Sequence, residues 1–103
     1  MEGHSSISTD VLATYAADAA RETPGVTHIA ESPLHRHGVR VTESSEGLRV
    51  ELHLAVEWGT SVPEVGAAVQ ERVAEYLGRM ADVVPASIDI VVDEVAAPPT
   101  AVS

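Results

Sequence analysis

The stretch that decides the fold is LRVELHLAVEW, which runs from Leu48 to Trp58. Apolar side chains occupy every second position, and mostly polar or charged side chains lie between them. Because successive side chains of a strand point to opposite faces of a sheet, this alternation predicts a strand with one core face and one polar face. The residues predicted to face the core are Leu48, Val50, Leu52, Leu54, Val56 and Trp58. A shift of one residue would expose the whole apolar row, so the register is predicted to be firm.

Three further strands are predicted around this one. Glu43–Gly47 is a polar turn that ends in glycine, which indicates a hairpin between a strand over Gly38–Glu43 and the long strand. A short strand is predicted over Val26–Ala30. The last strand covers Ser87–Val95 and has one apolar face and one mixed face. Its predicted inward residues are Ile88, Ile90 and Val92, and its predicted outward residues are Asp89, Val91, Asp93 and Val95.

Two amphipathic helices are predicted, one before and one after the first three strands in the sequence. The first begins at Ser8, a good N-cap residue, and stops at Pro24-Gly25. The second begins at Ser61 with capping-box spacing to a glutamate and continues to about Ala81. The apolar face of the first helix is predicted to comprise Val11, Leu12, Tyr15, Ala16, Ala19 and Ala20. That of the second is predicted to comprise Val62, Val65, Val69, Val73, Tyr76 and Met80.

The predicted element order is therefore α-β-β-β-α-β, an α/β (α+β) fold. Each helix has one apolar face and the sheet has one strongly apolar face, so a two-layer sandwich with both helices on one face buries all of them. A right-handed crossover would place the last strand parallel to the long one, which makes the sheet mixed. Residues 7–96 are predicted to form the domain, and residues 1–6 and 97–103 are predicted to be flexible tails.

Composition excludes several function classes. The chain has 103 residues, 16 of them acidic and 6 basic, and a formal net charge of −10; all the basic residues are arginine. An acidic domain without a basic stripe repels nucleic-acid phosphates and anionic lipid head groups. The absence of cysteine removes thiol chemistry and fits a reducing compartment. The N-terminus does not read as a signal peptide, and no apolar run approaches the roughly 20 residues that span a bilayer. A cytoplasmic protein without direct membrane insertion is predicted.

Three sequence motifs follow one another along the chain. Residues 7–20 fit I-S-x-x-V-L-x-x-Y-A-x-x-A-A and lead into P-G-V, and Val92–Val95 forms a V-D-x-V close. Between them, Val56–Met80 reads VEWGTSVPEVGAAVQERVAEYLGRM. In this order, over residues 7 to 96, the motifs resemble those of the bacterial alkaline shock protein family, also called the envelope stress response family.

The resemblance implies a non-enzymatic cytoplasmic protein linked to cell-envelope or alkaline stress. Members of this family are prone to self-assembly and are held near the membrane by a separate anchoring protein. The chain departs from many relatives at Glu31–His37, which is short and lacks their glycine-rich stretch, and it lacks their lysine-bearing flanks. Because partner contacts often lie in loops and tails, these departures leave the identity of the partner open.

The histidines near residue 35 could form a divalent metal site. His35 and His37, with His28 and Glu31 nearby, offer possible ligands. However, imidazoles two residues apart in an extended chain point to opposite sides, and Arg36 between them opposes a cation. A solvated polar loop is therefore favoured, and no metal or cofactor is predicted.

No catalytic residues are predicted either. Asp89 and Asp93 would lie roughly 13 Å apart along a strand, whereas a pair of glycosidase carboxylates is about 5–9.5 Å apart. The serines at the N-terminus and in the hairpin turn have no supporting base nearby in the sequence, and the glycines do not form a phosphate-binding loop. The sequence gives little support to an enzyme.

The outward face of the predicted sheet is the candidate partner-binding surface. It combines both charge signs with the apolar Val91, and it adjoins an unpaired edge strand. Its candidate residues are Arg40, Arg49, Glu51, His53, Glu57, Asp89 and Asp93. His53 is expected to be exposed there, with a carboxylate neighbour able to bring its titration near neutral pH. The alternative surface is the polar side of the second helix, with Gln70, Glu71, Glu75 and Arg79.

These observations favour a stress-response protein that acts by binding protein partners, either itself or a membrane-anchored relative. Its predicted location is the cytoplasm, peripheral to the membrane through that partner. The alternative is a regulatory or small-ligand-binding subunit of an envelope or lipid-synthesis enzyme, which a deep apolar pocket between helices and sheet would favour. A small metal-dependent enzyme is a third class, which metal content after purification would distinguish.

Overall fold

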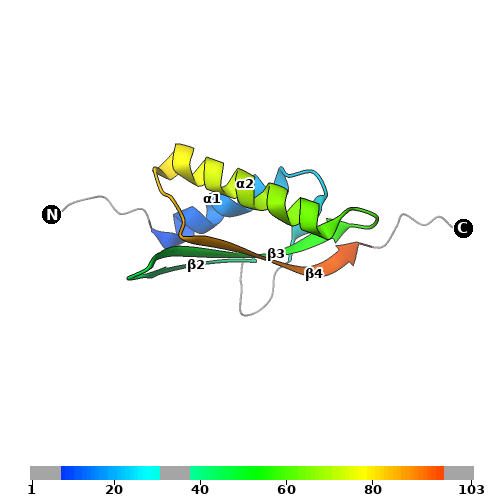
Figure 1. Ribbon diagram of the computed structural model, residues 1–103, viewed down its shortest axis with the longest axis horizontal. Helices are drawn as coiled ribbons and strands as arrows, with labels where there is room; N and C mark the ends of the chain where they lie inside the picture. Colours follow the sequence, from blue (N-terminus) through cyan, green and yellow to red (C-terminus); the bar gives the residue numbers. More distant parts are fainter. Residues whose placement is uncertain (1–7, 31–37, 97–103) are drawn as a thin grey trace, which may run out of the picture.

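Two helices lie side by side on one face of a four-stranded sheet (Figure 1). The computed structural model describes residues 8–30 and 38–96, so the predicted tails and the segment with His35 and His37 lie outside the described residues. The elements are α1 (Thr9–Arg21), β1 (Val26–Ile29), β2 (Val39–Ser44), β3 (Gly47–Glu57), α2 (Val62–Ala81) and β4 (Ser87–Ala96). This confirms the predicted order and the two-layer α+β architecture.

The long strand β3 is the centre of the sheet. It pairs with β1 and β2 in antiparallel fashion and with β4 in parallel fashion, so the sheet is mixed as predicted. The backbone N–H of His53 donates to the carbonyl of Gly38, and the His53 carbonyl accepts from the N–H of Ala30, each at 2.8 Å. Because both backbone groups of one strand residue face the same edge, β1 and β2 follow one another along one edge of β3, and β4 lies on the other.

The core lies between the sheet and the helices. The apolar residues of β3 from Leu48 to Val56 at alternate positions are buried, as the alternation predicted. Against them α1 presents mainly alanines, of which Ala16 and Ala20 have no exposed surface. These small side chains allow the backbone of α1 to approach the sheet closely. From α2 the buried residues are Val65, Val69, Val73 and Leu77.

Four predicted core positions are wrong. Trp58 is 64% exposed, because β3 ends at Glu57 and the chain turns at Trp58 and Gly59 toward α2. Met80 is 45% exposed, because the buried stripe of α2 repeats every four residues and so includes Leu77. Val11 and Val62, near the starts of their helices, are 40% and 38% exposed.

Both helices begin where the capping residues predicted. The hydroxyl of Ser8 accepts from the N–H of Val11 at 3.2 Å, and that of Ser61 accepts from the N–H of Glu64 at 3.3 Å. Each bond satisfies a backbone donor that has no partner inside the helix. The second helix ends at Ala81 and is capped by Asp82, a residue type that tolerates the left-handed conformation found there, with φ of 56°. Within the described residues, neither helix is long and apolar enough to cross a membrane.

Candidate functional site

The face of β3 that points away from the helices carries rows of charged side chains. The register places Arg40 of β2 and Asp89 of β4 on either side of Glu51. In the next row, Arg49 lies between Thr42 of β2 and Ser87 of β4. Arg40, Arg49 and Asp89 are exposed, and none of the described helices covers this side of the sheet (Figure 1). The predicted partner face is therefore an accessible surface on which both charge signs lie close together.

His53 joins β3 to β4 on this face. Its Nδ1 lies 2.8 Å from Oδ2 of Asp93, and its Nε2 lies 2.7 Å from Oε2 of Glu51. Both nitrogens meet a carboxylate, which only accepts, so the arrangement fits an imidazolium that donates from both nitrogens. The expectation that His53 is exposed is wrong: its side chain is only 14% exposed, because it lies between these two carboxylates.

The charge of His53 is favoured by this arrangement. Partial burial, the largest single influence, lowers the pKa of His53 because it penalises the charged form. The hydrogen bonds to Glu51 and Asp93, together with their negative charges, act the other way. The net result is that the pKa of His53 is raised above its ordinary value of 6.5.

The contribution of His53 to the stability of the protein is therefore expected to fall as pH rises past neutrality. Since the folded-state pKa of His53 is raised, its stabilisation is fully present below the unfolded-state pKa and is lost as pH rises through the folded-state pKa. Replacing His53 with glutamine should lower the free energy of unfolding by about 1–2 kcal/mol near pH 6, and by less near pH 9. Urea unfolding of both proteins across this range measures the difference.

The matched control is His28→Gln. The ring of His28 lies 3.2 Å from a carboxylate oxygen of Glu94, but both side chains are more than half exposed. An exposed pair of this kind contributes about 0–1 kcal/mol, so this variant should follow the wild-type pH profile closely. A His53→Gln deficit that stays constant or grows with pH would contradict the assignment.

A register shift shapes the far end of the face. Leu54 is level with Val92, but Ala55 is level with Glu94, so β4 has one extra residue, Asp93, at this point. His28 of β1 and Glu94 of β4 lie on either side of Ala55, which has no exposed surface. The small side chain of Ala55 leaves room for that ion pair across β3.

The same shift corrects one prediction for β4. Val95 is level with Val56, a core residue of β3, and is therefore not on the outward side. The inward residues Ile88, Ile90 and Val92 are packed against the core but only partly buried. Strict alternation along β4 would place Glu94 on the inward side, so Glu94 lies opposite His28 only because of this shift.

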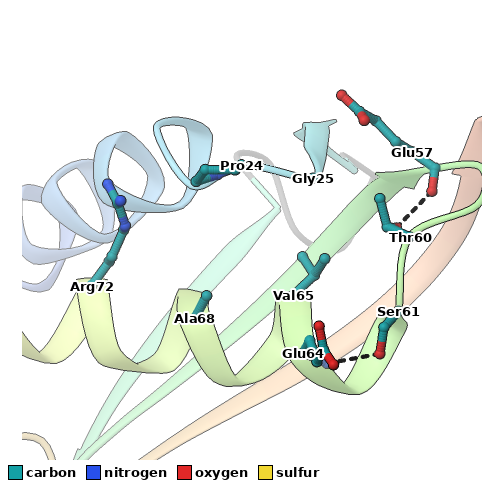
Figure 2. Close-up of a pocket in the computed structure, with 9 residues that line it drawn as sticks. All are labelled: Pro24, Gly25, Glu57, Thr60, Ser61, Glu64, Val65, Ala68 and Arg72. Atoms are coloured by element: carbon teal, nitrogen blue, oxygen red, sulfur yellow. Dashed lines mark hydrogen bonds between the residues drawn. The ribbon is translucent and has the colours of Figure 1, made fainter.

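Glu57 and Gln70 are placed differently from the other candidates. Glu57 lies at the end of β3 and lines a separate hollow with Gly25, Glu64 and Arg72 (Figure 2). Gln70 is not simply solvated, because its Nε2 donates to the carbonyl of Ile88 at 2.8 Å. The other predicted helix residues, Glu71, Glu75 and Arg79, are exposed. Of the predicted sheet residues, the structure brings together Arg40, Arg49, Glu51, His53, Asp89 and Asp93.

The hollow in Figure 2 lies between the turn after α1, the end of β3 and the first turns of α2. Its volume is about 580 Å³ and it is open to solvent. Glycine is needed at its wall, because Gly25 has φ of +96° and a Cβ there would lie 2.6 Å from a methyl of Val65. The hollow offers the carboxylates of Glu57 and Glu64 and the guanidinium of Arg72.

A metal site is not found in the part of the chain that the structure describes: no group of three or more histidine, aspartate or glutamate side chains there is arranged to hold an ion. Glu31, His35 and His37, the other possible ligands in the sequence, lie outside the described residues. The expectation of no metal stays a prediction.

Comparison with known proteins identifies the class. The model of the alkaline shock protein 23 family, a family with a cell envelope-related function, matches residues 1–97. The chain therefore belongs to the alkaline shock protein 23 family, as its motifs predicted. A curated relative, the uncharacterized protein YqhY of Bacillus subtilis (strain 168), is 30% identical over 89 residues, which cover 76% of this chain and 66% of YqhY. The chain thus spans slightly less than two thirds of that relative.

Solved structures share the fold at low identity. A variant of MamM-CTD has a TM-score of 0.58 at 14% identity, with 87% of this chain and 100% of that chain covered. The structure named MamM-CTD 215-293 has a TM-score of 0.57 at 13% identity, with 84% of this chain and 99% of that chain covered. These similarities establish the fold of the chain and carry nothing about its ligands.

Proposed function

We propose that this protein is a non-enzymatic member of the cell-envelope stress response that works by binding proteins through the outward face of its sheet. Its partner is either another copy of itself or a membrane-anchored relative, which would hold it at the membrane from the cytoplasm. The observation that carries this proposal is the accessible face of β2, β3 and β4 with its rows of opposite charges. Membership of an envelope-related family supports it.

The distribution of charge on this face suits pairing between copies. Its basic side lies toward β2, with Arg40, and its acidic side lies on β4, with Asp89 and Asp93. A second copy turned about a two-fold axis along the strands would bring the basic side of one sheet over the acidic side of the other. Such a self-complementary patch is what a symmetric pair requires.

Reversing one charge on the face should disrupt association. Arg49→Glu places a third carboxylate beside Glu51 and Asp89, so we expect self-association to weaken at least about tenfold in sedimentation velocity. Association of the wild type should also weaken with salt, because exposed charges are screened over about 8 Å at physiological ionic strength.

The matched control is Arg79→Glu, which makes the same change of net charge on the exposed side of α2. The guanidinium of Arg79 lies 5.5 Å from the ring centroid of Tyr76, away from the sheet face. If Arg79→Glu abolishes association and Arg49→Glu does not, the helix is the partner surface. A wild type that stays monomeric and binds no membrane-anchored relative would refute the proposal.

The hollow of Figure 2 supports an alternative, a regulatory or small-ligand-binding subunit of an envelope or lipid-synthesis enzyme. With Glu57, Glu64 and Arg72 at its walls, it would suit a small molecule that carries both charge signs. A panel of amino acids is therefore the appropriate probe. A ligand-dependent rise in Tm that Arg72→Ala removes would favour this alternative.

A further inference from the structure

The outer edge of β4 is open for backbone pairing. The Ile88 carbonyl accepts its hydrogen bond from Gln70 of α2, on the side away from β3. Because alternate residues of a strand direct their backbone groups to the same edge, the N–H and C=O groups of Ile90 and Val92 also face this outer edge. In residues 8–30 and 38–96, no strand pairs with it. Four backbone groups in succession are thus presented beyond the one that Gln70 covers.

A groove with apolar and polar lining runs along the same edge, between β4 and α2. One part, of about 270 Å³, is lined by Val62, Gly66 and Ala67 of the helix and by Ile90 and Val92 of the strand, among others. A second part, of about 490 Å³, continues along the first half of β4. Glycine and alanine on α2 leave the groove wide enough for small side chains.

Exposed apolar side chains lie on both faces of this edge: Val62 lines the groove, and Val91 is on the outward face of the sheet. Val62 is 38% exposed, Val91 is 37% exposed and Val95 is 49% exposed. They belong to the start of α2 and to β4, the two elements that form the groove. An added strand would bury parts of all three together with the half-buried Ile90 and Val92. Because burial of apolar surface is favourable, this burial would stabilise strand pairing at the edge.

The charges on β4 indicate which kind of segment can pair with this edge. The exposed side chains of β4 include Asp89, Asp93 and Glu94; the latter two pair with histidines, and no cation of the described residues pairs with Asp89. A second copy paired antiparallel about Val91 would set Asp89 against Asp93, and like charges directly opposite one another are destabilising. The complementary partner is a basic segment.

We propose that this edge binds an extended segment of a partner protein by strand addition. The segment carries arginine or lysine at positions i and i+4, opposite Asp89 and the Asp93–Glu94 end of β4, and an apolar residue at i+2, beside Val91. Positions i+1 and i+3 carry small apolar residues, which enter the groove. This inference rests on the proposed function, since it takes the protein to be a binder of proteins, and it assigns the edge to a partner other than a second copy.

A peptide titration of the full chain tests the pattern. The probe is the acetylated, amidated peptide Ser-Arg-Ala-Val-Ala-Arg-Ser, followed by amide NMR of the isotope-labelled protein. The amides of Ile90 and Val92 should shift and become protected from hydrogen exchange. Asp89→Arg should weaken binding about tenfold, because it replaces an attraction by a repulsion. Glu46→Arg, the same change in the exposed β2–β3 turn, should leave binding unchanged.

Two more peptides separate strand addition from charge attraction alone. N-methylation removes backbone N–H donors. In an added strand, the N–H groups of the two alanines and that of the valine point to opposite edges, so only one of these sets faces β4. Of two peptides, one methylated on both alanines and one on the valine, one should therefore bind and the other should fail to bind. Equal binding of both methylated peptides, or binding that moves no signal of Ile90 and Val92, would overturn the proposal. Failure of the unmodified peptide to bind would also overturn it. In that case the self-association of the Arg49→Glu variant, which tests the sheet face, shows separately whether the proposed function stands.

Discussion

Replacing Leu52 with alanine is expected to lower the free energy of unfolding by about 2–5 kcal/mol. Leu52 is fully buried in the central strand, between β2 and β4 and beneath the helices. The substitution removes apolar contacts and leaves a cavity that a sheet paired on both sides cannot collapse to fill. Urea unfolding followed by circular dichroism measures the loss.

The control for this variant is Val84→Ala. Val84 is 89% exposed in the connection between α2 and β4, so its truncation should change stability by less than about 0.5 kcal/mol. A loss below 1 kcal/mol for Leu52→Ala would mean that the apolar row of β3 is not the core of the domain.

Gly38→Ala is expected to cost about 2–4 kcal/mol of unfolding free energy. Gly38 has φ of +69°, a region that residues with a side chain rarely adopt. A Cβ there would also overlap a methyl of Ile29 and lie 2.5 Å from the carbonyl oxygen of Ala30. Because backbone atoms cannot move aside cheaply, β2 would have to shift. That shift would disturb the hydrogen bond from His53 and the register that sets Arg40 beside Glu51.

Gly59→Ala separates the two contributions. Gly59 also has a positive φ, +88°, but no described atom lies within 4 Å of a Cβ built on it. It should therefore show only the conformational cost, about 1–2 kcal/mol. Equal losses for the two glycine variants would show that the close approach of β1 and β2 at Gly38 does not constrain the fold.

The fold was largely predictable because its decisive signals are local. The alternation in β3 and the capping serines at Ser8 and Ser61 each act over a few residues, and each is where it was predicted. Trp58 was misplaced because the alternation continues in the sequence after the strand has ended. Met80 was misplaced because spacings of three and of four residues both fit a helical face until the direction of the sheet selects one of them.

The candidate site was less predictable because it depends on contacts distant in sequence. His53 and Asp93 are 40 residues apart, and only the parallel pairing of β3 with β4 brings them together. The extra residue in β4, which places Glu94 level with Ala55, has no compositional signal of its own. The bond from Gln70 to the edge of β4 likewise requires the crossover that lays α2 beside that strand.

In the two proposals, the sheet face and the β4 edge are distinct surfaces for protein contact. The face mixes both charge signs, so it suits another copy of the chain, whereas the edge is acidic and apolar, so it suits a basic segment of a different protein. The two meet at Asp89 and Asp93 of β4, which means that binding at one surface would alter the charge seen at the other.

Site-specific photo-crosslinking in cells that produce the protein tests the central claim most directly. The crosslinking residue p-benzoylphenylalanine would replace Thr42, which is exposed beside Arg49 on the sheet face, or Glu75, which is exposed on α2. We predict protein adducts, including dimers of this chain, from position 42 and none from position 75. Adducts from position 75 alone, or from neither position, would contradict a protein that works through the outward face of its sheet.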